Sequence, residues 1–369
     1  ASRLGKLMLS VRLLPARQGD AIWIRWGAKE HPYQLLIDMG TEGVGEQVRK
    51  RILALPEARR RFELLVVTHV DRDHIGGVLS ALAEADPIAG LVIGDVWFNG
   101  YPHLKGGSVS SALESMGPAQ GARLGNWLKR MPWNRAFHGA PVQRVPGEDV
   151  QRIELADDLV LKVLGPTPQR LLELEPVWID EVEAAIAKGS LSREVAGLES
   201  FGPKTPPILE DHHDLEALAE THTVSDKSEA NGSSIVLLLE YRGKSVLFAG
   251  DAFGSDLIEG MGALGVSGRL KLDAFKLPHH CSQSNIVPDL VGAVECGCWL
   301  VSTDGTQFRH PDPVAIARII RHAQPSSPLL AFNVKSKYSG WWDSDAWRDL
   351  FDYRTRYGSD TEGFELRLE

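Results

Sequence analysis

Cysteine is scarce in this chain, which has only Cys281, Cys296 and Cys298 among its 369 residues. Three cysteines do not make a disulfide framework, and Cys296 and Cys298 are too closely spaced to form a zinc ribbon. Burial in the strand that leads to Trp299 is the simpler interpretation of this pair. We therefore expect a protein of a reducing compartment, with the cytoplasm as its location.

Long hydrophobic runs are also absent. No apolar stretch approaches the roughly 18–20 residues that a helix needs to span a bilayer, and residues 1–6 lack the hydrophobic region of a signal peptide. Hydrophobic residues make up 43% and charged residues 24% of the chain, which is ordinary for a globular protein. We expect no membrane association, and the length suffices for one large core or two modest domains.

The chain has no excess of positive charge, because its formal net charge is −9. This value disfavours broad clamping of nucleic acid, which relies on many lysine and arginine contacts. It does not exclude a nuclease, since bound divalent cations would dominate the field at a phosphate. The basic stretches 49–51 and 59–61 are either a solvated helix face or a patch that steers phosphates. The motifs G-x-S-x-G and G-x-x-x-x-G-K-[ST] are both absent, so neither a nucleophilic serine nor a P-loop competes.

Residues 68–77, with the sequence T-H-V-D-R-D-H-I-G-G, carry the densest chemical signal in the chain. Four side chains that can bind a metal fall within six residues: His69, Asp71, Asp73 and His74. The preceding run 62–67 predicts a strand that ends in a turn, where several side chains can converge. Imidazole and carboxylate suit zinc, manganese or iron in hydrolytic sites, and this set exceeds one closed structural zinc site. The segment is therefore either a two-metal hydrolytic site or an acidic loop that happens to contain histidines.

This motif resembles that of the metallo-β-lactamase superfamily, whose usual form is H-x-H-x-D-H. Asp71 replaces the second histidine, and H-x-D-x-D-H is typical of the ComEC-like branch, meaning the hydrolase domain of the competence protein and its free-standing relatives. Teichoic-acid phosphorylcholine esterases are similar at this point. The resemblance implies one α/β domain over residues 1–369, an αββα four-layer sandwich, with two divalent ions, zinc or manganese, that activate a water molecule. The competence protein carries membrane helices, so the chain matches only its hydrolase part.

Hydrophobic periodicity predicts strands that alternate with helices. We expect strands at residues 8–26 (two strands with a turn), 33–39, 62–68, 91–98, 153–164 (a hairpin), 234–241, 244–249, 275–277, 298–302 and 364–368. We expect helices at residues 41–55, 73–85, 111–130, 167–188, 312–323 and 344–353. We interpret residues 99–230 as an inserted helical and loop region that covers or shapes the mouth of the site. It contains His212, His213 and His222, which we expect at the surface of a flexible acidic loop.

Three later segments resemble further motifs of the superfamily. Asp251 follows Gly250 at the end of a predicted buried strand, where the family places its metal-bridging carboxylate. Residues 276–282 resemble K-x-x-H-H-G-S, with Cys281 in the usual place of glycine. One of His279 and His280 should bind metal, while the other contacts phosphate or protonates a leaving group. His310 is either a ligand of the second site or a residue of the loop before the next helix.

Supporting residues follow from the same resemblance. Residues 18–24 match the ComEC-like opening and include Asp20, and Asp38 lies where the superfamily places an aspartate behind the metal-binding loop. We assign both to the support of metal ligands, with a turn before Gly40 as the alternative for Asp38. Residues 231–237 match the ComEC-like entry to a hairpin, a region where many members have a histidine ligand. No histidine lies between His222 and Asp251, so Asp71 is the obvious substitute.

These residues lead to one assignment and three functional hypotheses. The expected metal ligands are His69, Asp71, Asp73, His74, Asp251, His279, His280 and His310, and the expected catalytic residues are Asp73, Lys276, His279 and His280. Lys276 either pairs a phosphate oxygen or is exposed to solvent. ComEC-like hydrolase domains are associated with DNA degradation, so the first hypothesis is a phosphodiesterase or nuclease acting on single- or double-stranded nucleic acid. The alternatives are a small-ester or phosphorylcholine-type hydrolase and a non-catalytic binding module. No protein partner is predicted.

Overall fold

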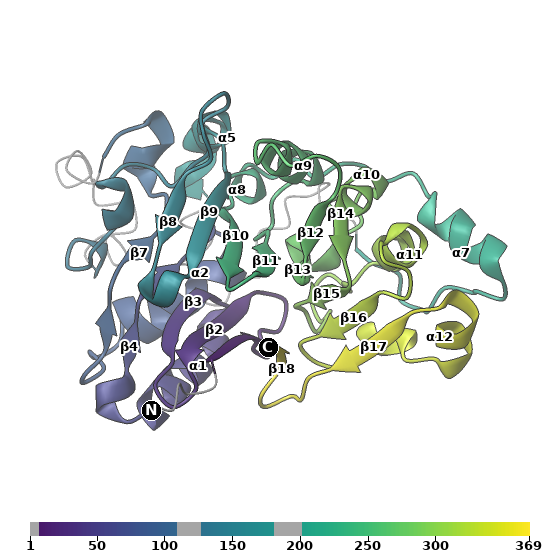
Figure 1. The fold of residues 1–369 in the computed structure, drawn as a ribbon, viewed down its shortest axis with the longest axis horizontal. Coiled ribbons are helices and arrows are strands. Elements are labelled where there is room, and N and C mark those ends of the chain that lie inside the picture. The colour runs from purple at the N-terminus through teal and green to yellow at the C-terminus, as the bar shows by residue number, and fades with distance from the viewer. Residues whose placement is uncertain (1–6, 109–126, 181–200) are drawn as a thin grey trace.

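Two β-sheets form the centre of the molecule in the computed structural model, which describes residues 7–108, 127–180 and 201–369 (Figure 1). The first sheet has the strand order β18 (Phe364–Leu368), β1 (Leu7–Leu13), β2 (Ala21–Ala28), β3 (Tyr33–Met39), β5 (Leu64–Val66) and β7 (Val96–Trp97). The second has the order β17 (Arg354–Tyr357), β16 (Leu329–Phe332), β15 (Cys298–Val301), β13 (Ala274–Lys276), β11 (Lys244–Phe248), β10 (Val236–Tyr241), β9 (Val160–Gly165) and β8 (Arg152–Glu154). Two short parallel pairs join β4 (Arg61–Phe62) to β6 (Val92–Ile93) and β12 (Leu270–Leu272) to β14 (Val294–Cys296).

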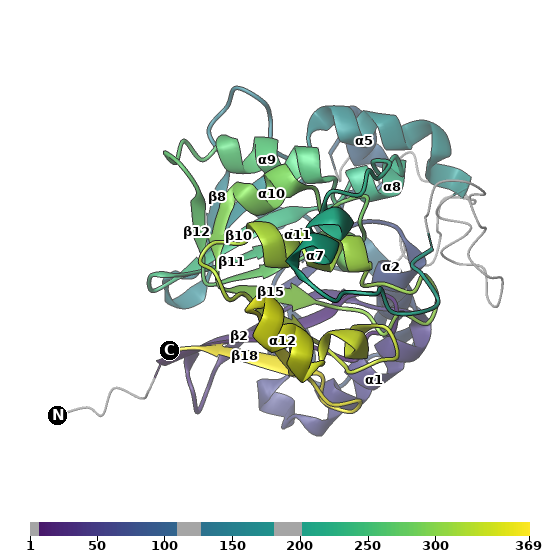
Figure 2. The ribbon, with the colours of Figure 1, turned by 90° about the vertical axis from the view of Figure 1, so that its right-hand side faces the viewer.

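Helices cover the outer face of each sheet. Those that lie against the first sheet are α1 (Glu42–Ala54) and α2 (Arg72–Val78), while α9 (Gly254–Gly262), α10 (Pro288–Gly292), α11 (Pro313–His322) and α12 (Asp345–Phe351) lie against the second. The remaining described α-helices are α5 (Pro168–Leu174), α7 (His212–Ala219) and α8 (Glu229–Gly232). In Figure 2, α9 and α10 lie above the sheets and α1 lies below them. The order helix, sheet, sheet, helix is the predicted αββα sandwich.

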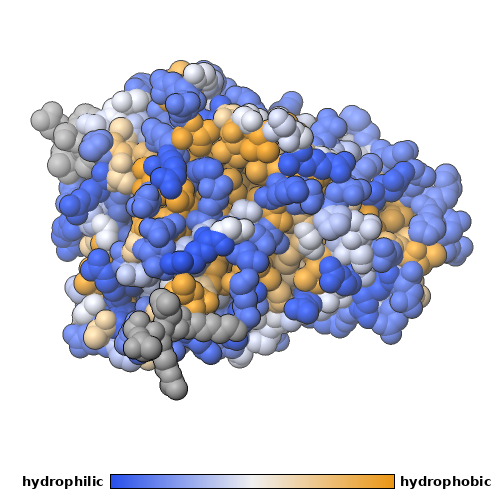
Figure 3. Space-filling view, in the orientation of Figure 1, coloured by the Kyte–Doolittle hydropathy of each residue, from blue (hydrophilic) through white to orange (hydrophobic). Residues whose placement is uncertain are grey.

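Alternating side chains in the strands explain this layering. On β2, Ile22 and Ile24 pack into the core between the two sheets, whereas Trp23 packs into the core beneath α1 and α2. On β10, Leu237 faces the inter-sheet core and Leu238 faces the core beneath α9 and α11. A strand that is apolar on both faces can bury both only inside a layered fold. On the face shown in Figure 3, hydrophobic residues gather toward the middle and hydrophilic residues around the rim. No helix in the described part of the chain is long and apolar enough to cross a membrane.

Most of the predicted elements are confirmed, with differences at their ends. The strand predicted at 62–68 is divided into β4 and β5, and the helix predicted at 73–85 consists of α2 followed by a π-helical turn, Leu79–Ala83. Residues 181–188 of one predicted helix and residues 111–126 of another lie outside the described residues. The strands β16 and β17 were missed, because their short sequences show no distinctive periodicity.

The region predicted as an insertion contributes to the core. The hairpin of β8 and β9 extends the second sheet beside β10, so this part is continuous with the sandwich. The expectation of a flexible acidic loop around His212 was wrong, because residues 212–219 form α7. This helix packs against α11 through Leu215 and Ala219. The histidines at 212, 213 and 222 are exposed, as expected.

Two glycines set the distance between the first helical layer and its sheet. A Cβ atom added at Gly77 would lie 2.0 Å from the carbonyl oxygen of Met39, and one at Gly45 would lie 2.3 Å from the Cα of Gly77. Helices α1 and α2 therefore meet backbone to backbone. This contact holds α2, which carries part of the 68–77 motif, tightly against β3.

We expect Gly77→Ala to lower the free energy of unfolding by about 1–3 kcal/mol, because the added methyl group forces the backbone to move. Gly43→Ala is the matched control, since nothing lies within 4 Å of a Cβ at that position on α1. The control should stabilise the protein by up to about 1 kcal/mol through helix propensity. Urea unfolding of the two variants measures both effects, and equal stability would contradict the packing argument.

Candidate metal centre

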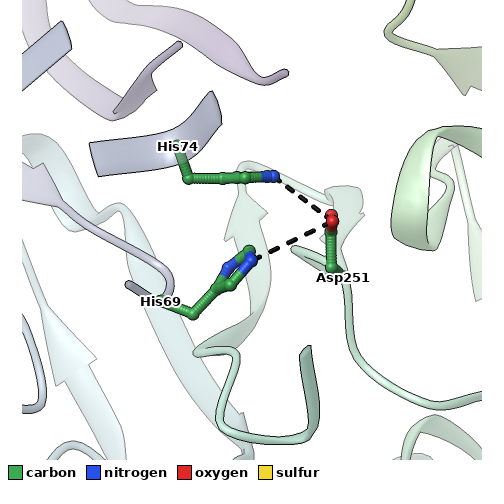
Figure 4. A group of neighbouring side chains, drawn as sticks. All are labelled: His69, His74 and Asp251. Carbon is green, nitrogen blue, oxygen red and sulfur yellow. Dashed lines mark ion pairs between the residues drawn. The ribbon is translucent and has the colours of Figure 1, made fainter. Parts of the chain in front are cut away.

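Three buried side chains from separate elements converge where the two sheets meet (Figure 4). His69 follows β5, His74 lies in α2, and Asp251 follows β11. The Oδ2 atom of Asp251 lies 3.3 Å from Nε2 of His74 and 4.0 Å from Nε2 of His69. One carboxylate oxygen from the second sheet thus faces two imidazoles that belong to the first half of the chain.

His280 completes the centre from the second sheet. It lies in the turn Pro278–Cys281 after β13, and its Nε2 atom is 3.4 Å from Asp251 Oδ2 and 3.5 Å from Asp73 Oδ2. The potential ligand atoms of Asp73, His74 and His280 lie within 4.8 Å of one another, as do those of His69, His74 and Asp251. The two groups overlap, so the geometry offers neighbouring positions for cations rather than one closed site.

Several buried atoms at this centre have no hydrogen-bond partner, and they show whether the centre fits a metal. The unpaired atoms at the centre are Nε2 of His69, Nε2 of His74, Nε2 of His280 and Oδ1 of Asp251. Leaving a buried polar atom unpaired costs about 1–3 kcal/mol, so several at one point is unusual in a native fold. Divalent cations with mixed imidazole and carboxylate ligands would satisfy all four atoms. The donor set therefore fits a divalent metal.

The pKa shifts of the groups at the centre also favour a bound cation. Burial by itself raises the pKa of Asp251, but the imidazoles of His74 and His280 outweigh it and hold this pKa well below its ordinary value. Burial likewise raises the pKa of Asp73, while its close contact with His280 and the nearby imidazole of His74 bring the value to about 2. For His280, burial lowers the pKa, and the carboxylates around it, Asp251 first, reverse that effect and raise it to about 9. The buried carboxylates are stabilised by nearby positive charge. A divalent cation would supply that charge in place of the protons on the imidazoles.

Each of the three histidines is oriented through its other ring nitrogen. The Nδ1 atom of His74 lies 2.8 Å from Oδ2 of Asp38, and Nδ1 of His280 lies 2.9 Å from the carbonyl oxygen of Ser302. The Nδ1 atom of His69 lies between two hydroxyl oxygens, 3.0 Å from Thr68 and 3.3 Å from Ser234. These contacts direct all three Nε2 atoms to one point, as partners of metal-binding histidines do.

Asp38 also ties the metal loop to β3. Its carboxylate accepts hydrogen bonds from the backbone N–H (2.8 Å) and the hydroxyl (2.6 Å) of Thr68. The carbonyl oxygen of Thr68 accepts in turn from the N–H of Ile235, 2.9 Å away, at the start of the β10 region. Asp38 is fully buried with a left-handed φ of 54°, so it has a role beyond that of a turn residue.

The turn after β13 separates its two histidines. Residues 279, 280 and 281 all have left-handed backbone, with φ values of 45°, 54° and 67°. His280 points to the centre, whereas Nδ1 of His279 points to Asp226 and Asn285, at 3.2 Å and 3.0 Å. The left-handed φ of Cys281 explains why glycine suits this position, since glycine adopts that conformation without strain.

Three predicted ligands lie at or beyond the edge of the centre. Oδ2 of Asp71 is 3.5 Å from Nε2 of His69, but the side chain remains 29% exposed. Nδ1 of His310 lies 3.3 Å from Oδ1 of Asp312, and its ring centroid is 5.7 Å from that of His279. Among the described residues, the groups with ligand atoms in mutual reach include none of Asp71, His279 and His310. Their assignment as ligands stays a prediction.

Lys276 lies in neither of the two environments predicted for it. Its side chain is fully buried and forms an ion pair with Asp20, and its Nζ atom donates to the carbonyl oxygen of Gly250 at 3.2 Å. The expectation that Lys276 pairs a phosphate or is exposed was therefore wrong. Asp20 lies behind the centre, with Oδ1 3.7 Å from Nδ1 of His280. A Cβ at Gly19 would lie 1.8 Å from the carbonyl oxygen of Asp73, so this loop packs directly on the metal motif.

Two residues near the centre carry no signal in the sequence. Asp226 lies in a polar stretch with several other acidic residues, and Asn285 follows the histidine pair by five or six positions. Neither belongs to a motif with a characteristic spacing. Only the folded chain brings both to Nδ1 of His279.

We expect Lys276→Met to destabilise the protein by about 3–5 kcal/mol, because it leaves the buried carboxylate of Asp20 without its partner. The double variant Asp20→Asn with Lys276→Met removes both charges and should recover much of that loss. Chemical denaturation of the three proteins provides the comparison. A single variant as stable as the parent would show that the ion pair does not hold this loop.

We expect Asp251→Asn to bind far less Zn²⁺ or Mn²⁺ than the parent, because an amide cannot place negative charge between the three imidazoles. Asp289→Asn, at an exposed position in the first turn of α10, is the control and should retain the parent's metal content. Elemental analysis after dialysis gives the stoichiometry, with circular dichroism as the check on folding. Undiminished metal in a folded Asp251→Asn protein would rule out this centre.

Comparisons with known proteins agree with the fold. The family model of the metallo-beta-lactamase superfamily matches residues 15–303, and no curated protein matches the chain. Among solved structures, the metallo-beta-lactamase fold protein YhfI from Bacillus subtilis is 11% identical, with 98% of this chain and 100% of that chain covered and a TM-score of 0.41. A mutant of CmlA beta-hydroxylase is 12% identical, with coverage of 100% and 55% and a TM-score of 0.37.

Both TM-scores are below 0.5, so these similarities support no conclusion about this chain. The family model, in contrast, spans well over half of the chain, and the residues it covers include His69, His74, Asp251 and His280. Members of this family are generally metal-dependent hydrolases, in keeping with the donor set at the centre. The chain belongs to the metallo-beta-lactamase superfamily.

Proposed function

We propose that the protein is a metal-dependent phosphodiesterase whose substrate is a nucleic acid. The observation that supports the proposal most strongly is the group of buried, unpaired imidazole and carboxylate atoms around Asp251. The substrate class rests on the resemblance of the H-x-D-x-D-H motif, with Asp71 in place of histidine, to the ComEC-like branch. The proposal thus joins a site suited to hydrolysis with a motif associated with DNA degradation.

The candidate ligands fall into two groups, one for each of two cations, and Asp251 belongs to both groups. Asp73, His74, His280 and Asp251 would hold one, and His69, Asp71 and Asp251 the other. Bound divalent cations lower the pKa of water and offset negative charge that develops on phosphate oxygens. Asp38 and the carbonyl group of Ser302 keep His74 and His280 in place, so the ligands need little rearrangement on binding.

Three arginines of the two basic stretches are engaged in local structure. The guanidinium group of Arg49 donates to the carbonyl oxygens of Ala81 and Asp86, and that of Arg60 donates to the carbonyl oxygens of Leu55 and Ala89. Arg51 pairs with Glu362. These three groups are therefore not free to bind phosphate, and the proposal assigns attraction of a phosphodiester mainly to cations at the centre.

We expect turnover of single-stranded DNA, double-stranded DNA or RNA in the presence of Mn²⁺ or Zn²⁺, and no turnover by Asp251→Asn. The panel also contains a generic phosphodiester, a phosphomonoester, a phosphorylcholine ester, a lactam and a lactone. Chelation of the metal should abolish the activity and its return should restore it.

Other outcomes of this panel distinguish the alternatives. Cleavage of the small esters alone would replace the nuclease with a small-ester or phosphorylcholine-type hydrolase. Failure to turn over any substrate, despite full metal loading, would favour a binding module on the same fold. Asp289→Asn serves again as the control for nonspecific effects of a lost surface charge.

A further inference from the structure

A second polar cluster lies beside the metal centre, around His279. Its ring centroid is 6.0 Å from that of His280, and its backbone N–H donates to the carbonyl oxygen of Gly250 at 3.2 Å. His279 therefore lies directly next to the candidate ligands His280 and Asp251. The side chain is nearly buried, with 7% of its surface exposed.

Asp226 is the charged member of this cluster and comes from the segment between α7 and α8. Its Oδ2 atom lies 3.2 Å from Nδ1 of His279 and accepts from the side-chain amides of Asn231 (2.7 Å) and Asn285 (3.0 Å). Its Oδ1 atom accepts from the backbone N–H of Ser228 at 2.9 Å. A carboxylate with this many donors is held in one orientation and remains ionised.

The orientation of Asn285 defines which nitrogen of His279 carries a proton. The Nδ2 atom of Asn285 donates to the carbonyl oxygens of Asp251 and Ala252, both at 3.2 Å, as well as to Asp226. A flipped amide would turn its oxygen toward these three acceptors, so Oδ1 must face His279, at 3.0 Å. Nδ1 of His279 thus lies closest to two acceptors, Asn285 Oδ1 at 3.0 Å and Asp226 Oδ2 at 3.2 Å. The Nδ2 atom of Asn231 is farther away, at 3.4 Å, and donates to Asp226 at 2.7 Å. It carries a proton, and Nε2 lies on the opposite edge of the ring.

One buried arginine anchors both partners of His279. The guanidinium group of Arg318, on α11, donates to the carbonyl oxygens of Ala219 (3.1 Å) and Thr221 (2.7 Å), in the segment that leads to Asp226. The same group donates to carbonyl oxygens of residues 283 and 286, on either side of Asn285, at 2.9 Å and 2.8 Å. The positions of Asp226 and Asn285 are therefore coupled through α11, which makes the environment of Nδ1 rigid.

We propose that Asp226 is a positioning residue, which, with Asn285, orients His279 so that Nε2 of this histidine contacts the substrate at the metal centre. The inference rests on the proposed hydrolytic function and adds to it a residue outside the family's motifs. The arrangement is the same in kind as the carboxylate that holds a catalytic histidine in one tautomer and one orientation. Asp226 itself does not touch the reacting atoms.

The test compares Asp226→Asn with Asp226→Glu in the full chain. We expect Asp226→Asn to lower kcat by about 10–100-fold, the range seen when an orienting partner of a histidine is lost. Metal content and the urea midpoint should stay at parental values, because Asp226 is not a ligand. Asp226→Glu should recover part of the activity, since it restores a carboxylate. Glu210→Gln is the control, an exposed acidic position just before α7, and should behave as the parent.

A second measurement follows the ring directly. In protein labelled with ¹⁵N-histidine, the His279 signals are assigned by their loss in His279→Gln. We expect the parent to show a protonated Nδ1 and Asp226→Asn to lose that signature. Unchanged ring signals in Asp226→Asn would overturn the proposal, as would unchanged kcat or a loss of activity that merely follows loss of metal. If the parent turns over no substrate, the proposed function fails, while the ring signals still report whether Asp226 orients His279.

Discussion

Burial of charge at the junction of the two sheets is the constraint on which this structure depends. Asp251, Asp38, His74 and His280 are all almost completely inaccessible to water. Ionised carboxylates and imidazoles in such a place are costly unless each has a partner. The fold supplies partners on one side of every ring, through Asp38, Ser302 and the hydroxyl groups beside His69. On the other side, the Nε2 atoms converge without partners, which is the property that a divalent cation needs.

The same constraint extends behind the centre. The buried pair of Asp20 and Lys276 joins the loop between β1 and β2 to the end of β13, and so connects the two sheets by charge. Gly19 lets that loop lie against the backbone of Asp73, where any side chain would collide. A lysine next to a histidine pair suggests a phosphate ligand when only the sequence is considered. In the fold it neutralises an aspartate that supports His280, so its contribution to the centre is indirect.

The long segment between the two halves of the sandwich has at least two different roles. Its hairpin, β8 and β9, completes the edge of the second sheet, and its later part delivers Asp226 to the neighbourhood of His279. Arg318 secures this later part by hydrogen bonds to backbone carbonyl groups, which do not depend on the side chains of the segment. A stretch with little recognisable pattern can therefore be placed firmly beside the centre. This explains how a region outside the family's motifs can influence the site.

The sequence by itself determined the layered fold, the location of the 68–77 motif after a buried strand, and Asp251 as its downstream partner. These features depend on local patterns, namely strand alternation and the dense spacing of ligands, which persist whatever the rest of the chain does. Only the tertiary structure decided which of His279 and His280 faces the centre, because that choice depends on left-handed backbone at residues 279–281. It also decided the partners of Lys276 and His279. Asp20 and Asp226 lie far from them along the chain, and pairing over such distances follows from how the sheets and α11 pack, which no local pattern records.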